Sequence, residues 1–208
     1  MQVSLPEGEW VITAVREFES SGDTKLVDVC LFQSSGNKLS KFMRFRSSIE
    51  KSFNGGWASS RICSRDNFHY KNVKNNETQE NQDCRYVNQM VPYWLDSKSE
   101  FSCECARFVN ERKLEFSNHA IQSYFCFTDD DNILQIRYCF FPSNEGFKNY
   151  PKVRWAHSPW NKTSVSSDLK KGAYVDSIIK WTDTYYSTVK TGFKGGLTTI
   201  PLVVVLHR

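Results

Sequence analysis

Cysteine and histidine side chains offer the first candidates for chemistry in this sequence, which holds seven cysteines and four histidines. A catalytic thiol needs a thiolate beside an imidazole, and Cys63 and His69 lie nearest to each other along the chain. No local signature of a cysteine enzyme surrounds them, and adding Cys84 gives no usual zinc-ligand spacing. We therefore predict a structural role for Cys63, and the sequence assigns no catalytic residue, metal or cofactor.

Two tryptophans and a histidine lie close together in WAHSPWNKTS, residues 155–164. Trp155 and Trp160 offer flat faces on which a sugar or a peptide could stack, with His157 as a polar partner, so these three are the candidate ligand-binding residues. The alternative is a packed corner, in which Pro159 fixes a turn and both rings cover the join between a hairpin and the last helix. The sequence favours the corner, because large aromatic side chains are mostly buried.

Acidic and amide side chains cluster in DDDN, residues 129–132. Clustered oxygens can bind calcium, but the run lacks the glycine and the distal glutamate of an EF-hand loop. Asp and Asn are also ordinary residues of hairpin turns, so we expect a turn here. Asn76 and Asn161 fit the N-glycosylation pattern, in segments that we expect to be exposed.

The composition is that of a soluble globular protein of one domain, with 208 residues, 39% of them hydrophobic, and a net charge of +4. From Lys152 onward basic residues are in excess, but they come singly or as one lysine pair, not as the dense stripe of a nucleic-acid surface. No run approaches the ~20 apolar residues of a transmembrane helix. We expect a protein or small-molecule partner, no nucleic acid and no transmembrane segment.

The cysteines, none in a CxxC motif, are many for a reduced cytosolic chain and favour disulfides in an oxidising compartment. Cys63 and Cys84 flank much of a polar tract, residues 71–84, and are the first candidates for a disulfide, although sequence alone does not fix the pairing. The start MQVSLPEGEW lacks the features of a signal peptide, so a leader is presumed to have been removed. The sequence favours a periplasmic or secreted protein; the alternative is a cytoplasmic one with buried free thiols.

The sequence predicts an α+β domain as the scaffold for the candidate site residues, and the first elements of this domain are strands. Segments rich in β-branched and aromatic residues alternate with polar breaks at Gly22 and Gly36, which predicts a three-stranded antiparallel meander over residues 1–45. Residues 46–96 show no regular pattern, and we predict a loop-rich region whose Asn-rich tract is exposed.

Residues 97–195 are predicted to form a helix, a hairpin and a second helix. Asp96 or Ser97 is placed to cap the first helix. In the hairpin, a turn that sets Thr128 opposite Ile133 makes alternate residues share a face. The core face then carries Phe125, Phe127, Leu134, Ile136 and Tyr138, and the other face Tyr124, Cys126, Gln135, Arg137 and Cys139.

The last helix is predicted over residues 168–194, with Ser166 or Ser167 as its cap and a glycine pair after its end. Apolar side chains at helical spacing should pack it on the sheet through Trp181 and Tyr185. The chain thus reads as one α+β domain, 1–208, with a mainly antiparallel sheet, one mid-chain helix and one long C-terminal helix.

The chain resembles a set of uncharacterised exported proteins of Gram-negative bacteria in four stretches: GGWASSRIC (55–63), DC (83–84), YCFFPSNEGF (138–147) and SPWNKTSVSSDLKKGAYVDSIIKW (158–181). The similarity runs in order from about Leu5 to Gly195. It implies a bacterial source and export to the periplasm, and it marks Cys63 and Cys84 as recurring cysteines. The set has no established activity, so the resemblance transfers no catalytic residue. Residues 196–208 lie beyond it, and either a late edge strand or an untypical terminus fits them.

We therefore expect an exported protein of the bacterial cell envelope that has no catalytic activity and acts as a binding or interaction module. The alternative is a small hydrolase or thiol-dependent enzyme with a site near Trp155 and His157 and a free cysteine. A cysteine and a histidine within hydrogen-bond reach in a concave pocket would favour the enzyme.

Overall fold

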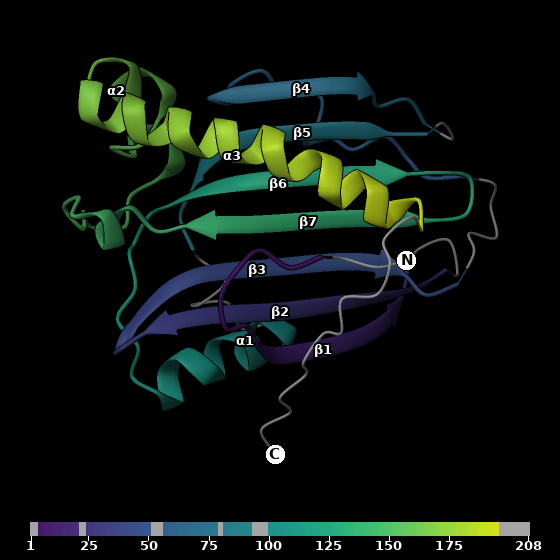
Figure 1. Ribbon diagram of the computed structural model, residues 1–208, viewed down its shortest axis with the longest axis horizontal. Helices are drawn as coiled ribbons and strands as arrows, with labels where there is room; N and C mark the ends of the chain where they lie inside the picture. Colours follow the sequence, from purple (N-terminus) through teal and green to yellow (C-terminus); the bar gives the residue numbers. More distant parts are fainter. Residues whose placement is uncertain (1–3, 21–23, 51–55, 79–80, 93–99, 196–208) are drawn as a thin grey trace.

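A computed structural model describes residues 4–20, 24–50, 56–78, 81–92 and 100–195. Its centre is one antiparallel sheet of seven strands in the order β1-β2-β3-β7-β6-β5-β4 (Figure 1). The strands are β1 (Val11–Glu19), β2 (Lys25–Ser35), β3 (Lys38–Ser48), β4 (Tyr70–Asn75), β5 (Asp83–Met90), β6 (Ala120–Thr128) and β7 (Ile133–Phe140). The predicted α+β class with a mainly antiparallel sheet is confirmed.

The first three strands form the predicted meander, with β2 between β1 and β3. Gly36 turns the chain from β2 into β3 with a φ of +59°, in the left-handed region that glycine enters without a Cβ clash. Most of β2 is buried on both faces, which suits its run of apolar residues.

The region 46–96, predicted to be irregular, contains the two strands β4 and β5. All but the last residue of β5 is buried, although the strand carries Arg85 and Gln89. The strand was not predicted because polar side chains usually indicate exposure. Their burial here depends on hydrogen-bond partners from distant elements. The Arg85 guanidinium, for example, donates to the Asp183 carboxylate of the last helix at 2.7 Å.

The hairpin of β6 and β7 has the predicted register, with Thr128 opposite Ile133. Asp129 closes its turn, because its Oδ1 accepts hydrogen bonds from the backbone N–H groups of Asp131 at 3.0 Å and Asn132 at 2.6 Å. The acidic run is therefore a turn, as expected. The predicted core face is buried in one cluster, which includes Phe125, Phe127, Leu134, Ile136 and Tyr138.

In the described part of the chain, three α-helices accompany the sheet: α1 (Glu100–Glu111), a short α2 (Lys162–Ser166) and α3 (Leu169–Phe193). Short 3-10 turns cover Pro142–Glu145 and Trp155–His157. α1 and α3 correspond to the two predicted helices, whereas α2 was not predicted. The expected caps of α1 and the tail 196–208 lie outside the described residues.

The predicted cap of α3 at Ser166 or Ser167 is wrong, because the chain first makes the separate helix α2, and these serines end it. Asp168 caps α3 instead. Its carboxylate accepts hydrogen bonds from the backbone N–H groups of Lys170 at 3.0 Å and Lys171 at 3.1 Å. A carboxylate can satisfy two of the N–H groups that a helix leaves open, and it also suits the positive end of the helix dipole.

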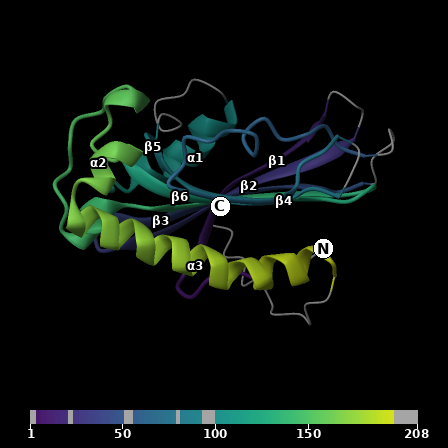
Figure 2. The ribbon, with the colours of Figure 1, turned by 90° about the horizontal axis from the view of Figure 1, so that it is seen from above.

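The two faces of the sheet are covered differently (Figure 2). α3 lies across β5, β6 and β7 on one face, and the N-terminal segment joins it there, with Trp10 against Tyr138 at 5.8 Å. α1 covers the other face, where the disulfide of Cys30 and Cys105 ties it to β2. Residues 56–68 cover the β5 end of that same face through Phe68.

α3 is fixed to the sheet by apolar contacts and by buried polar pairs. The Trp181 ring lies 4.5 Å from that of Tyr138, and Tyr185 joins the same cluster, so the predicted packing is confirmed. Thr182 Oγ1 donates to Ser123 Oγ at 2.9 Å, and both residues are fully buried. No helix in the described part of the chain is long and apolar enough to cross a membrane.

Candidate functional site

The predicted ligand-binding residues Trp155, His157 and Trp160 lie in the connection that leads through α2 into α3. Only 1% of Trp160 is exposed, against 39% of Trp155. The Trp160 ring meets the rings of Phe147 and Tyr174 at centroid distances of 5.0 and 5.8 Å. A ring sealed in this way offers no face to a ligand, so the two tryptophans do not form a shared platform.

Hydrogen bonds attach this segment to the sheet. Gln89 of β5 donates through Nε2 to the Trp155 carbonyl at 2.9 Å, and His69 Nε2 lies 3.0 Å from the Trp160 carbonyl. Burial lowers the pKa of His69, which favours a neutral ring that donates to this carbonyl. Asn161 caps α2 with its side chain. These contacts fit the structural corner that the sequence favoured.

A serine and a histidine that the sequence analysis did not connect meet beside this corner. Ser158 Oγ lies 3.3 Å from His119 Nδ1, and His119 Nε2 lies 2.9 Å from the Pro151 carbonyl. A hydrolase also pairs a serine with a histidine, but its nucleophile must reach a substrate. Both residues here are only 1% exposed, and Ser158 Oγ also accepts the backbone N–H of Trp160. The contacts of Ser158 and His119 are therefore those of a structural pair that holds the corner in place.

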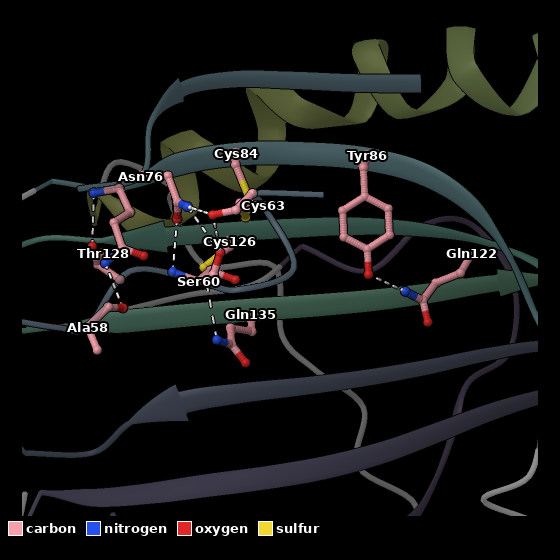
Figure 3. Close-up of a disulfide and its surroundings, with 12 residues drawn as sticks. Ala58, Ser60, Cys63, Asn76, Cys84, Tyr86, Gln122, Cys126, Thr128 and Gln135 are labelled. Carbon is pink, nitrogen blue, oxygen red and sulfur yellow. Dashed lines mark hydrogen bonds between the residues drawn. A yellow bond between two sulfur atoms is a disulfide. The ribbon is translucent and has the colours of Figure 1, made fainter. Parts of the chain in front are cut away.

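Among the described residues, two disulfides involve four of the cysteines. The predicted bond of Cys63 and Cys84 is present (Figure 3). The bond of Cys30 and Cys105 was not predicted, since its partners are 75 residues apart and no local pattern links them. Cys63 therefore has no thiolate to offer His69, which excludes the nearest Cys–His pairing of the sequence in this oxidised state.

Two further cysteines, Cys126 and Cys139, are free and buried. They share a face without lying opposite each other, as predicted. Burial raises the pKa of Cys126 to about 11 and raises the pKa of Cys139 as well, so both are thiols at neutral pH and poor nucleophiles. Across the described residues, no group of three or more His, Cys, Asp or Glu side chains is placed to hold a metal.

A charged hollow lies on the sheet face opposite α3, over β2, β3 and β7. We call it the arginine hollow, and it is lined by Asp28, Arg44, Arg46, Gln135 and Arg137. Because side chains alternate along a strand, these residues all point to the same face. The register then places Arg44 directly opposite Arg137 and Arg46 directly opposite Gln135.

Asp28 is the fixed centre of the hollow, with no exposed surface. It accepts one hydrogen bond from Arg44 Nη2 at 2.7 Å and two from Arg46, through Nε at 3.0 Å and Nη2 at 2.9 Å. Burial alone would raise the pKa of Asp28, but the hydrogen bonds and charges of Arg46 and Arg44 outweigh it and lower the pKa below its usual value. The carboxylate is therefore ionised at neutral pH.

Positive charge is in excess around this carboxylate. Arg16 lies 3.6 Å from Asp28 as well, so three guanidinium groups contact this carboxylate, and Arg137 adds a fourth to the lining of the hollow. Burial lowers the pKa of Arg44, and the adjacent charge of Arg137 adds to this effect. No carboxylate of the described residues pairs with Arg137, whose guanidinium carbon lies 5.9 Å from the ring centre of Tyr124.

The hollow is small and open to solvent. Its inner space is about 20 Å³, which is room for about one water molecule or one oxygen atom of a ligand at its mouth. Guanidinium forks match the oxygens of a carboxylate, a sulfate or a phosphate, and the Gln135 amide adds a neutral donor. The arrangement can therefore hold the oxyanion group of a ligand.

Sequence reasoning missed this site although it placed Gln135 and Arg137 on the correct face. The pairing of β3 with β7 brings Arg44 and Arg46 beside them, and nothing local in the sequence specifies that pairing. One usable signal was present, namely arginine at alternate positions of a predicted strand, with Asp28 in the strand before it.

The chain was also compared with known proteins. No protein-family model, no curated protein and no solved structure matches it. The resemblance to exported bacterial proteins therefore stays a prediction, and the candidate site depends on its own geometry.

Proposed function

We propose that the protein is an exported, non-catalytic binding module of the bacterial cell envelope, and that its ligand carries an oxyanion that docks in the arginine hollow. One observation carries the proposal: Arg137 lies directly opposite Arg44, in a hollow that has a single carboxylate among the described residues. Excess positive charge that is held by a sheet and open to water favours anion binding.

Electrostatics supports an anion between these two arginines. Like charges directly opposite each other on neighbouring strands are destabilising. Two unit charges 5–10 Å apart repel by about 2 to 3 kcal/mol at an effective dielectric constant of ~20. A bound oxyanion between them adds two attractions that offset this repulsion, so Arg137 and Arg44 are the residues that we expect to contact the ligand.

Asp28 supports the same proposal through its position. It engages Arg44 and Arg46 from a fully buried site, so it holds their side chains in place without neutralising the whole cluster. Rigid donors lose less conformational entropy when a ligand binds. No carboxylate among the described residues pairs with Arg137, so we expect its positive charge to be available to the ligand.

The described thiols and imidazoles favour binding over the alternative of a thiol-dependent enzyme or hydrolase. Cys126 and Cys139 are buried thiols with raised pKa values. The contact between Ser158 and His119 is closed to solvent. His157 is exposed, but no described thiol is paired with it.

Two disulfides support the export part of the proposal, since such bonds persist mainly in oxidising compartments such as the periplasm. The bond of Cys30 and Cys105 links a strand to a helix, and that of Cys63 and Cys84 links the covering segment to β5. Each bond is expected to stabilise the fold by roughly 2 to 4 kcal/mol. A bacterial source and the cell envelope follow from the resemblance alone and belong to the proposal.

Calorimetry with inorganic phosphate as the probe tests anion binding, with chloride at equal ionic strength as the reference. Wild-type protein should bind phosphate saturably, and Arg137→Gln should weaken binding at least tenfold, since a charge-assisted pair contributes about 1.4 kcal/mol or more. Arg107→Gln is the matched control, because Arg107 lies on the exposed side of α1.

Equal phosphate affinity of the Arg137→Gln and Arg107→Gln proteins would refute the site. So would equal effects of phosphate and chloride at one ionic strength, because that result would indicate screening without binding.

A further inference from the structure

Three cysteines gather on the sheet face opposite α3, next to the arginine hollow. The Cys63 and Cys84 disulfide and the free thiol of Cys126 lie in one buried cluster. Figure 3 shows Cys126 below the disulfide, with Gln135 on its other side. Gln135 Nε2 lies 4.0 Å from Cys126 Sγ. A thiol therefore shares a closed apolar space with a disulfide.

The sheet register gives Cys84 a second possible partner. Cys84 and Cys126 are directly opposite on β5 and β6 and point to the same face. Opposed residues of antiparallel strands have Cα atoms roughly 4.5 to 5.5 Å apart, which falls within the range of about 4.4 to 6.8 Å that disulfides span. The present bond to Cys63 has a Cα separation of 6.2 Å.

We propose that these three cysteines form a thiol–disulfide exchange site, in which Cys126 displaces Cys63 from Cys84. The Cys126 thiolate attacks Cys84 Sγ, the bond between Cys126 and Cys84 forms, and the bond between Cys84 and Cys63 breaks. Cys63 leaves as a thiolate and takes up the equivalent of the proton that Cys126 gave up. One disulfide and one thiol are present before and after, so the step needs no external oxidant or reductant.

Burial holds the reaction back at neutral pH. Since burial raises the pKa of Cys126 to about 11, only about one thiol in ten thousand is a thiolate at pH 7. The exchange rate should rise about tenfold for each pH unit up to that pKa. Cys126 thus acts as a protected thiol that reacts slowly unless its surroundings open.

After the exchange the free thiol would be that of Cys63, which lies nearer the surface than Cys126. Cys63 is itself buried, but its neighbours Arg61 and Ser64 are exposed, whereas Cys126 lies in a strand buried along its whole length. The covering segment has attachments that do not need the disulfide. Asn76 and Ser60 exchange two hydrogen bonds, at 2.9 and 3.0 Å. The segment can therefore stay docked after the exchange and present the Cys63 thiol to other disulfides.

This inference goes beyond the proposed binding function. The exchange requires no anion, and phosphate binding requires no thiol. Gln135 borders both the hollow and the Cys126 sulfur, but Arg44 and Arg137 take no part in the exchange. Failure of one proposal therefore leaves the other to be judged by its own experiment.

Alkylation of the folded, oxidised protein followed by disulfide mapping tests the exchange. At pH 7, Cys63 should be protected and bonded to Cys84. After incubation at about pH 9.5, mass spectrometry should find a peptide pair linked through Cys84 and Cys126 and an alkylated Cys63. In Cys126→Ser the alkylation of Cys63 should slow at least tenfold, whereas Cys139→Ser, which removes an equally buried thiol without a cysteine opposite it, should match wild type.

A second variant tests the new bond directly. Cys63→Ser, folded under oxidising conditions, should contain a disulfide between Cys84 and Cys126. The proposal is overturned if this folded variant keeps both as alkylatable thiols, or if Cys63 is alkylated equally fast with and without Cys126. If Cys63→Ser does not fold, the comparison of wild type with Cys126→Ser decides alone.

Discussion

Replacing Asp28 with Asn should show how strongly the arginine hollow depends on this buried acid. The carboxylate is fully buried and accepts three hydrogen bonds from Arg44 and Arg46, at 2.7 to 3.0 Å. The side-chain amide in Asp28→Asn is nearly the same size but carries no charge. Its oxygen can still accept hydrogen bonds, whereas its NH₂ group is a donor and cannot accept from a guanidinium. Two guanidinium groups then lose their partner while the packing volume hardly changes.

The expected loss of stability depends on how deeply Asp28, Arg44 and Arg46 are buried. Removing one member of a buried ion pair costs about 3 to 5 kcal/mol. The side chains of Arg44 and Arg46 keep 24% and 33% of their surface exposed and can regain water, so we expect the lower end, about 3 kcal/mol. In a domain of this size, 1 kcal/mol shifts Tm by roughly 2 to 4 °C, so the loss is about 6 to 12 °C.

Urea unfolding followed by tryptophan fluorescence at several pH values measures the effect and its origin. The pKa of Asp28 in the folded protein lies below its usual 3.8, so its charge stabilises the fold fully above that value and progressively less as pH falls through the folded pKa. The difference between wild type and Asp28→Asn should be constant from about pH 7 to 5 and shrink below about pH 4. Phosphate should restore part of the loss, because an anion can replace the missing charge.

Asp66→Asn is the matched control. Asp66 pairs with Lys71, but its side chain is 90% exposed, and such surface pairs contribute at most about 1 kcal/mol. A loss below about 1 kcal/mol for Asp28→Asn would refute the reasoning, as would a loss that persists unchanged at about pH 3.

Two further predictions concern the corner that leads into the last helix. Trp160→Ala should lower the free energy of unfolding by about 3 to 5 kcal/mol, because the ring is buried. Trp155→Ala should lower it by much less, because 39% of Trp155 is exposed. Similar losses for the two variants in denaturant titrations would contradict the structural corner. Asp168→Ala should lower the stability by about 1 kcal/mol, because α3 loses its N-terminal cap. Ser167→Ala should lower it by little. In thermal melts monitored by circular dichroism, a larger loss for Ser167→Ala than for Asp168→Ala would support the serine cap that the sequence predicted.

Local patterns in the sequence were enough for the meander, the central hairpin and the long helix. The turn at residues 129–132 predicted the register that sets Thr128 opposite Ile133, and the alternation of side chains along a strand then gave the faces of that hairpin. Cys63 and Cys84 were also the first candidates for a disulfide, because they flank much of one polar tract, and the structure contains that bond. These features depend on residues close together in the chain, where spacing alone carries the information.

The strand β5 and the cap of α3 were not predictable in the same way. Arg85 and Gln89 make β5 look exposed, yet α3 and the final corner supply their partners from far along the chain. Asp168 and Ser167 are both acceptable caps by type, and only the presence of α2 decides between them. In each case the outcome depends on what lies nearby in space.

The candidate site was decided by tertiary structure. The sequence by itself determined that Arg44 and Arg46 share one strand face and that Gln135 and Arg137 share another, since side chains alternate along any strand. Only the pairing of β3 with β7 sets Arg44 against Arg137, with Asp28 beside them, and makes one charged hollow. Charges repel or attract across a few ångströms of space whatever their separation in the chain, so the concentration of positive charge on which the proposed anion site depends exists only in the folded sheet.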